Sequence, residues 1–248
     1  MNILITGATG FVGKHLVAKL MSHNLTILSR NVDNAVKVLG KQHVYIEDLS
    51  QLSNLDEFDA VINLAGEPIV AKRWSKKQKQ YICDSRWNIT QQISLLIKSS
   101  KIPPKTFISA SAIGFYGRQG NSPVDENSGF HDEFSHQICH KWEQLALAAQ
   151  STTTRVCIPR IGIVLGKNGG ALAKMLPPFK LGLGGPIGKG QQGMSWVHQD
   201  DLIALIIWML NTPNAHGVYN ATAPNPVSNS VFSQALAKAL NRPAKIIT

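Results

Sequence analysis

The sequence has no paired cysteine framework and no apolar run long enough to cross a membrane. Its three cysteines, Cys83, Cys139 and Cys157, form no CxxC pattern, which argues against a disulfide scaffold and a zinc ribbon. The longest late apolar run, LIALIIWML at 202–210, is too short to span a bilayer as a helix. Residues 2–5 are apolar, but no basic segment precedes them and a glycine turn follows, so no signal peptide is expected. These features predict a cytoplasmic protein without a metal site.

Acidic residues are scarce in the last part of the chain. After Glu143 the only acids are Asp200 and Asp201, against nine lysines and arginines, and the formal net charge of the whole chain is +10. Five basic residues gather in KRWSKKQK at 72–79, around Trp74. One interpretation is a nucleic-acid-binding surface. We favour a solvated face beside a cleft for an anionic ligand, because no nucleic-acid-binding module is visible in the sequence.

Short apolar runs alternate with helical patterns through the first two thirds of the chain. A helical pattern begins at Phe11, and longer ones cover roughly 75–100 and 133–149. The alternation predicts an α/β fold with a doubly wound parallel sheet that is covered by helices on both faces. The runs that predict strands are 2–6, 25–29, 43–47, 60–65, 105–110 and 154–159.

The composition changes after this alternation. Residues 162–193 contain ten glycines and three prolines, which is typical of a functional loop region or a smaller lobe. A helical pattern returns at 200–211. We therefore expect a dinucleotide-binding domain over 1–165 and a smaller C-terminal substrate lobe over 166–248, with 199–220 returning to the first domain.

The turn ITGATGFVG places three glycines between the first strand and the first helix. Gly7, Gly10 and Gly13 suit a tight turn, close approach of a pyrophosphate to the backbone, and close packing of helix on strand. The start of the helix adds free N–H groups and a positive dipole end. The motif predicts a Rossmann-type dinucleotide site. The residues expected to contact the dinucleotide here are Gly7, Thr9, Gly10, Phe11, Val12 and Gly13.

The end of the second expected strand indicates which dinucleotide is bound. NAD sites usually have an acid there that accepts from the ribose 2′-hydroxyl. This sequence has Ser29 and Arg30 instead, and the guanidinium of Arg30 suits a 2′-phosphate and the adenine ring. NADP is therefore favoured over NAD. Asp48 and Leu49, after the third strand, fit a contact to adenine, although a surface turn would look the same.

At this point the sequence resembles a known family, the extended short-chain dehydrogenases/reductases, and within it the sugar-nucleotide epimerase-like branch. Members of that branch usually continue for several tens of residues beyond the position of Thr248, so the resemblance implies that part of the substrate lobe is missing or reduced here. The motifs that carry the resemblance are ITGATGFVG, VINLAGEPI (61–69), SRWNIT (85–90), SASAIGFYG (109–117), PRIGIVLGKNGGAL (159–172) and GQQGMSWVHQDDL (190–202).

The resemblance implies further site residues. Ser111 matches the serine that hydrogen-bonds a substrate carbonyl or hydroxyl, with a plain strand-end serine as the alternative. The segment beside the nicotinamide is implied to contain Pro159, Arg160 and Ile161. The segment after the fourth strand, implied to line the cofactor cleft, contains Asn63, Leu64, Ala65 and Gly66.

The proton-transfer pair of the family is absent. Extended reductases have a tyrosine and, four residues later, a lysine on one helix face. When Glu143 is aligned with the glutamate that often follows this pair, Ser135 stands at the tyrosine position and Cys139 at the lysine position. None of the four tyrosines has a lysine four residues on. The epimerase-like branch itself commonly shows this departure.

Two side chains are candidate substitutes for the missing acid. His136 has a suitable natural pKa, and Tyr116 lies beside the serine motif. A helical projection places His136 with Asp132, His140 and Glu143 on one polar stripe, for which we favour a solvated face over a metal or catalytic site. Cys139 fits a small buried residue better than a nucleophile.

These observations leave three functional hypotheses. The first is an NADP(H)-binding epimerase or reductase-like protein that acts on an unidentified small molecule, with Ser111, Tyr116 and His136 as catalytic candidates. The second is a non-catalytic NADP(H)-binding regulatory or scaffold protein. The third, a nucleic-acid binder that uses 72–79, is disfavoured. The sequence predicts no membrane partner and does not settle the oligomeric state.

Overall fold

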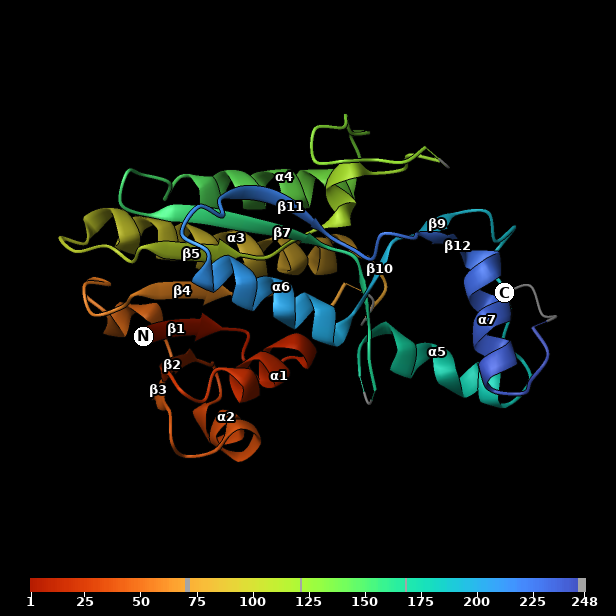
Figure 1. Cartoon of the computed structure of the whole chain (residues 1–248), viewed down its shortest axis with the longest axis horizontal. Helices are drawn as coiled ribbons and strands as arrows, with labels where there is room; N and C mark the ends of the chain where they lie inside the picture. The colour runs from red at the N-terminus through yellow and green to blue at the C-terminus, as the bar shows by residue number, and fades with distance from the viewer. Residues whose placement is uncertain (70–71, 121, 168, 245–248) are drawn as a thin grey trace.

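A computed structural model describes residues 1–69, 72–120, 122–167 and 169–244, and its centre is an eight-stranded sheet (Figure 1). The strand order is β11-β7-β5-β4-β1-β2-β3, with β6 beside β7, and all pairings in this sheet are parallel. This arrangement confirms the expected doubly wound Rossmann-type fold. The strands are β1 (Asn2–Thr6), β2 (Asn24–Leu28), β3 (Val44–Ile46), β4 (Ala60–Asn63), β5 (Thr106–Ser109), β6 (Ser111–Ala112), β7 (Arg155–Ile161) and β11 (Gly217–Ala221).

The apolar strands are covered on both faces, as their continuous hydrophobic runs require. In β1, Ile3 and Ile5 pack with one set of helices, and Leu4 packs with the other. The first set is α1 (Phe11–Lys19), α2 (Val32–Leu39) and α6 (Gln199–Asn211). The second set is α3 (Lys76–Ser99) and α4 (Phe134–Leu147). Successive strand residues point to opposite faces, so both layers are buried by one apolar run.

The two long helices of the second face have different starts. At α3 the hydroxyl of Ser75 accepts from the backbone N–H of Gln78, which caps the helix directly after the basic run. At α4 the N-cap residue Glu133 makes no side-chain cap. The two helices pack together on the face of the sheet opposite to α1, α2 and α6. Both expected helical segments are observed within two residues of their predicted ends.

The chain beyond β7 is divided between the sheet and a smaller group of elements. Helix α6 packs on the sheet and β11 extends it beside β7. The smaller group lies at one end of the molecule in Figure 1. It contains β8 (Ile163–Leu165), α5 (Gly170–Lys180), β9 (Gly193–Met194), β10 (Trp196–His198), β12 (Val227–Ser228) and α7 (Asn229–Ala239). Of the lobe expected over 166–248, Asn168 and residues 245–248 lie outside the described residues.

Within residues 1–69, 72–120, 122–167 and 169–244, no helix combines the length and apolarity that a bilayer crossing needs. The longest helix, α3, is 24 residues and carries the end of the basic run in its first turn.

Candidate cofactor and substrate cleft

A cavity of about 350 Å³ opens at the carboxyl ends of the central strands. In open α/β sheets, ligands bind beyond these strand ends near the point where the strand order reverses, here between β1 and β4. The wall combines segments that follow β4, β5 and β7 with one face of α4. Its lining residues are Leu64, Ala65, Gly66, Ile69, Trp74, Arg86, Ala110, Ser111, Ala112, Ile113, Gly114, Ser135, Ile138, Cys139, Trp142, Ile161, Gly162 and Ile163.

The glycine turn after β1 has the geometry that a dinucleotide needs. Gly7 has φ +70°, and a Cβ there would lie 2.5 Å from the backbone of Leu64. A Cβ on Gly13 would lie 2.3 Å from the carbonyl oxygen of Gly7, so only glycine allows α1 to pack this closely on the turn. These two positions bring the start of α1 beside the end of β4.

The first turn of α1 is open to an anion. Gly10 is the exposed N-cap and provides no side-chain cap, so the first N–H groups of α1 have no side-chain partner there. Thr9, Phe11 and Val12 are partly buried in the same turn. The ring of Phe11 fills the space beside Gly169, where a Cβ would come within 2.2 Å of it. The turn therefore fits the pyrophosphate of a dinucleotide.

The second cofactor contact expected from the sequence lies at the end of β2. Arg30 is exposed, and its Nη1 donates to the hydroxyl of Tyr81 on α3 at 2.9 Å. The hydroxyl of Ser29 donates to the carbonyl oxygen of Asn31, and the Asn31 side chain caps α2. The guanidinium of Arg30, which is hydrogen-bonded to the Tyr81 hydroxyl, thus follows β2 at the place where an NAD site has an acidic residue.

Asp48 and Leu49 have structural roles in this structure. The Asp48 carboxylate accepts from the backbone N–H of Ser50 and caps a short 3-10 helix over Leu49–Gln51. The backbone and side-chain hydrogen bonds from Ser50 hold the pKa of Asp48 below its usual value. Leu49 is buried with its side chain in the core. Their expected contact with adenine stays a prediction.

The two positions of the missing proton-transfer pair both face the cavity. Ser135 and Cys139 line it one helical turn apart, and Gly114 packs against both of them. Burial and the charge of Glu143 raise the pKa of the Cys139 thiol to about 11. The thiol is therefore protonated at neutral pH and cannot serve as a thiolate nucleophile or base.

Ser111 lines the cavity but its hydroxyl hydrogen points away from it. The hydroxyl donates to the Glu143 carboxylate at 2.5 Å, and Glu143 forms a buried bidentate ion pair with Arg160. Arg160 also donates to the hydroxyl of Tyr116, which in turn donates to Asn220. Burial alone would lower the pKa of Arg160, but the hydrogen bonds that it donates to Glu143 and Tyr116 outweigh this effect and raise that pKa.

Some of the expected site residues line the cavity, and others are buried behind its wall. Arg160 and Tyr116 are both almost fully buried in the network, and neither lines the cavity. Pro159 is buried in β7, and Ile161 at its end reaches the cavity wall. Asn63 is fully buried, and its hydrogen bonds with the hydroxyls of Thr6 and Thr90 stabilise the end of β4. Leu64, Ala65 and Gly66 do line the cavity.

The polar stripe expected on α4 is not solvated throughout. Glu143 and His136 are buried, whereas Asp132 and His140 are exposed. His136 stacks on Phe130 at 3.7 Å between ring centroids, and its Nδ1 donates to the carbonyl oxygen of Phe115. His136 does not line the cavity. The expectation of a solvated stripe was wrong for these two residues, because Phe130 covers His136 and Glu143 pairs with the buried Arg160.

Arg86 is a cavity residue that the sequence reasoning missed. It lies on α3, is 8% exposed, and is the single charged side chain among the lining residues. Its sequence signal is its place on the apolar face of α3, four residues after Ile82 and four before Thr90, both of which are fully buried. An arginine at such a position needs a local reason.

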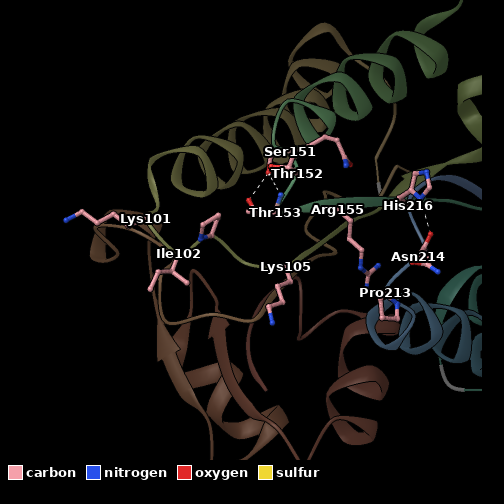
Figure 2. Close-up of a pocket in the computed structure, with 12 residues that line it drawn as sticks. Lys101, Ile102, Lys105, Ser151, Thr152, Thr153, Arg155, Pro213, Asn214 and His216 are labelled. Atoms are coloured by element: carbon pink, nitrogen blue, oxygen red, sulfur yellow. Dashed lines mark hydrogen bonds between the residues drawn. The ribbon is translucent and has the colours of Figure 1, made fainter.

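A larger and more open hollow of about 900 Å³ lies at the opposite edge of the sheet (Figure 2). Lys105, Arg155 and His216 stand there at or just before the amino ends of β5, β7 and β11. The guanidinium of Arg155 donates to the carbonyl oxygens of Leu210 and Ala215, which ties the end of α6 to β7. None of the site residues expected from the sequence lines this hollow, so size alone does not mark it as the site. In the described part of the chain, no cluster of three potential metal ligands occurs.

Comparison with known proteins gives one consistent family. A sequence model of the NAD dependent epimerase/dehydratase family matches residues 3–222. The chloroplastic epimerase family protein SDR39U1 homolog of Arabidopsis thaliana is 40% identical over 252 residues, covering 98% of this chain and 72% of that protein. Epimerase family protein YfhF of Bacillus subtilis is 38% identical over 250 residues, covering 98% and 81%. The crystal structure of human epimerase family protein SDR39U1 with NADPH has a TM-score of 0.89 at 34% identity, covering 100% of this chain and 82% of that one.

Proposed function

The chain belongs to the NAD-dependent epimerase/dehydratase family, and on that premise we propose that it binds NADP(H) for a redox reaction of a small molecule in the 350 Å³ cavity. When bound, NADPH would supply a hydride from its nicotinamide, and the oxidised form, NADP+, would accept one. A cavity of this volume is at the small end of ligand sites. It therefore favours a compact substrate.

One observation carries the cofactor assignment: the open, uncapped start of α1 at Gly10, held against β4 by Gly7 and Gly13. Arg30 supports NADPH over NADH, because its cation can pair with a 2′-phosphate. The human relative solved with NADPH, at 34% identity, points the same way. The three buried free thiols support a reducing compartment such as the cytoplasm.

We assign a separate role to each polar side chain at or near the substrate end of the cavity. Ser111 has given its hydrogen to Glu143, so its oxygen is free to accept from a substrate hydroxyl. Ser135 lines the cavity as a second small hydroxyl. Neither is a strong acid or base. Proton transfer would then fall to a substrate group or to water, with the roles of Tyr116 and His136 confined to supporting the wall.

A second candidate is a non-catalytic NADP(H)-binding protein. The observation that favours it is the pair Ser135 and Cys139, which face the cavity without a group that is both acidic enough and basic enough to shuttle a proton. The two candidates share the cofactor site and differ in turnover. A screen of small aldehydes, ketones and oxo acids with NADPH, followed by its absorbance, separates them.

The cofactor proposal is tested with Gly10→Ala. A Cβ on Gly10 meets only the carbonyl oxygen of Gly7, at 3.1 Å, so the fold should tolerate it while a methyl group blocks the pyrophosphate. We expect NADPH affinity by calorimetry to fall roughly tenfold or more, the size of one lost charged hydrogen bond. Gly129→Ala, where a Cβ meets nothing within 4 Å, is the matched control. No NADPH binding by the unmodified protein, or no effect of Gly10→Ala, would overturn the proposal.

A further inference from the structure

The guanidinium of Arg86 is held rigidly at the cavity wall by the backbone. Its Nη1 donates to the carbonyl oxygen of Ile82 and its Nη2 to that of Glu67, both at 3.0 Å. A Cβ on Gly66 would lie 3.0 Å from its Cζ, so the glycine allows the guanidinium to lie directly under the segment after β4. The ring of Trp142 lies 5.3 Å from the same Cζ. These contacts fix the position of the charge.

Arg86 has no counter-ion among the residues that the structure describes. Three ion pairs within 4.0 Å occur among the described residues, and none of them includes Arg86. Its Nε–H makes no hydrogen bond to the described part of the chain. Burial lowers its pKa, and the charge of Glu67 opposes this shift without forming an ion pair within 4.0 Å. A guanidinium nevertheless keeps its proton in proteins, so a nearly buried, unpaired cation remains at the cavity.

No other described residue in the cavity wall is charged. Apart from Arg86, the lining consists of aliphatic and aromatic side chains, glycines, Ser111, Ser135 and the protonated thiol of Cys139. An unpaired charge in such surroundings is costly and is strongly stabilised by an opposite charge. The wall therefore suits a ligand with one negative group and an otherwise compact, mostly apolar body.

The basic residues around Trp74 should also attract anions toward the cavity over a longer range. Trp74 lines the cavity, and its indole N–H donates to the carbonyl oxygen of Ile69. The basic residues 72–79 surround this tryptophan, and Lys72, Arg73, Lys76 and Lys77 are exposed. Such a cluster beside a cleft raises the local concentration of anions.

We propose that the substrate carries a carboxylate that pairs with Arg86 inside the cavity, which makes Arg86 the residue that determines substrate charge. The inference deepens the proposed function and depends on that cavity being the substrate site. One guanidinium matches the single charge and the planar shape of a carboxylate. A phosphate dianion would need a second cation or several further donors, which the lining does not contain.

The experiment compares carboxylates with their neutral amides. Acetate, butyrate, benzoate and oxamate are titrated by calorimetry against acetamide, butyramide, benzamide and oxamide, with inorganic phosphate as a further probe. Each titration is run with and without saturating NADPH. The proteins are the unmodified chain, Arg86→Met, Arg86→Lys, and the control Lys98→Met, which removes an exposed charge from the same helix. NADPH affinity is measured separately for each protein.

We expect carboxylates to bind the unmodified protein and the Lys98→Met control roughly ten- to a hundredfold more tightly than amides, as a charged hydrogen bond implies. Arg86→Lys should keep part of this preference, and Arg86→Met should lose it with NADPH affinity unchanged. Equal binding of carboxylates and amides, tighter binding of phosphate than of every carboxylate, or loss of NADPH affinity in Arg86→Met would each overturn the inference. The comparison of carboxylate with amide in the unmodified protein decides the matter even if Arg86→Met does not fold. A lack of NADPH binding by the unmodified protein counts against the proposed cofactor alone, because the anion preference is also read without it.

Discussion

The Ser111 hydroxyl donates its hydrogen to the Glu143 carboxylate, although the Ser111 side chain stands at the wall of the cavity. Glu143 is held in turn by two hydrogen bonds from Arg160, with both side chains more than nine-tenths buried. The ion pair therefore sets the direction of the serine hydrogen. It leaves Ser111 an acceptor toward a ligand, which suits a hydroxyl of the substrate better than a carbonyl.

Removal of one partner of this buried pair should be strongly destabilising. Glu143→Ala leaves the Arg160 cation buried without its counter-ion, and such changes cost about 3–5 kcal/mol. The double change Glu143→Leu and Arg160→Met should recover much of that loss, because it removes both charges. Urea unfolding at neutral pH measures both variants. Arg118→Ala, which breaks the exposed pair with Glu133, should change the midpoint little, and an equal loss in both single variants would contradict the argument.

The thiol of Cys139 should make stability depend on pH in the alkaline range. Its pKa is raised to about 11 by burial and by Glu143, above the value of an unfolded cysteine. The folded protein therefore holds a proton that the unfolded chain releases, so the stabilising contribution is complete below the unfolded pKa and is lost as the pH rises toward 11. Across that window the loss should reach about 2–3 kcal/mol.

The measurement compares the unmodified protein with Cys139→Ala by urea unfolding at several pH values between neutral and alkaline. The difference between the two proteins should shrink as the pH rises, because only the unmodified one loses this contribution. A constant difference would show that Cys139 titrates as it does in the unfolded chain. Iodoacetamide should also modify the native protein slowly, since all three free cysteines are buried.

Much of the fold was accessible from the sequence because its strands are buried on both faces. Each of the six expected strands lies within two residues of the bounds of an observed one, and the glycine turn fixed the position of α1. The strand β11 was not specifically predicted, since GVYNA is short, mixed in polarity and only partly buried. Helix α2 was missed because its apolar pattern covers only eight residues.

The site was harder to derive because its charges are arranged by tertiary contacts. The turn glycines and the cavity positions of Ser111, Ser135 and Cys139 follow from motif spacing. The burial of His136 and Glu143 does not, since Phe130 and the pair with Arg160 come from other segments of the chain. Helical spacing alone showed these residues on a polar stripe. A projection of one helix cannot show what another segment places over it.

Cofactor preference should depend on Arg30. In the unmodified protein NADPH should bind more tightly than NADH, because the guanidinium pairs with the 2′-phosphate. Arg30→Ala should lower NADPH affinity roughly tenfold or more and leave NADH affinity nearly unchanged. Tyr81→Phe, which removes only the hydroxyl that holds Arg30, should have a smaller effect on NADPH. Equal affinities for both cofactors in the unmodified protein would refute this prediction.

The basic residues 72–79 should not be a nucleic-acid site. Lys76 and Lys77 are exposed, and Lys79 lies over the Phe134 ring at 4.6 Å. Replacement of these three lysines by glutamine should leave NADPH affinity nearly unchanged, since the pyrophosphate site lies at the start of α1. Binding to DNA or RNA at physiological salt should be weak before and after the change. Tight nucleic-acid binding that the triple variant abolishes would reverse this conclusion.

This protein should bind the cofactor but should not catalyse epimerisation. NADPH should bind, because the glycine turn, the start of α1 and Arg30 do not involve the positions of the missing pair. The absent lysine should cost at most about 1.5–3 kcal/mol of cofactor affinity, the strength of a charged hydrogen bond. When a hydride leaves the carbon that carries a sugar hydroxyl, a positioned base must also accept the hydroxyl proton. At the expected positions stand Ser135 and the protonated thiol of Cys139.

The assay therefore incubates purified protein with UDP-glucose or UDP-galactose in the presence of cofactor and follows sugar interconversion, alongside the NADPH titration. We expect binding of NADPH without detectable epimerisation. Mutation of the candidates sharpens the result: Tyr116 is engaged by Arg160 and Asn220, and His136 is covered by Phe130, so Tyr116→Phe and His136→Gln should not alter NADPH affinity. Epimerisation at an ordinary enzyme rate that either variant abolishes would show that a buried residue reaches the substrate after all. A different side chain would then perform the family's chemistry, either His136 on α4 or Tyr116 in the segment after β6.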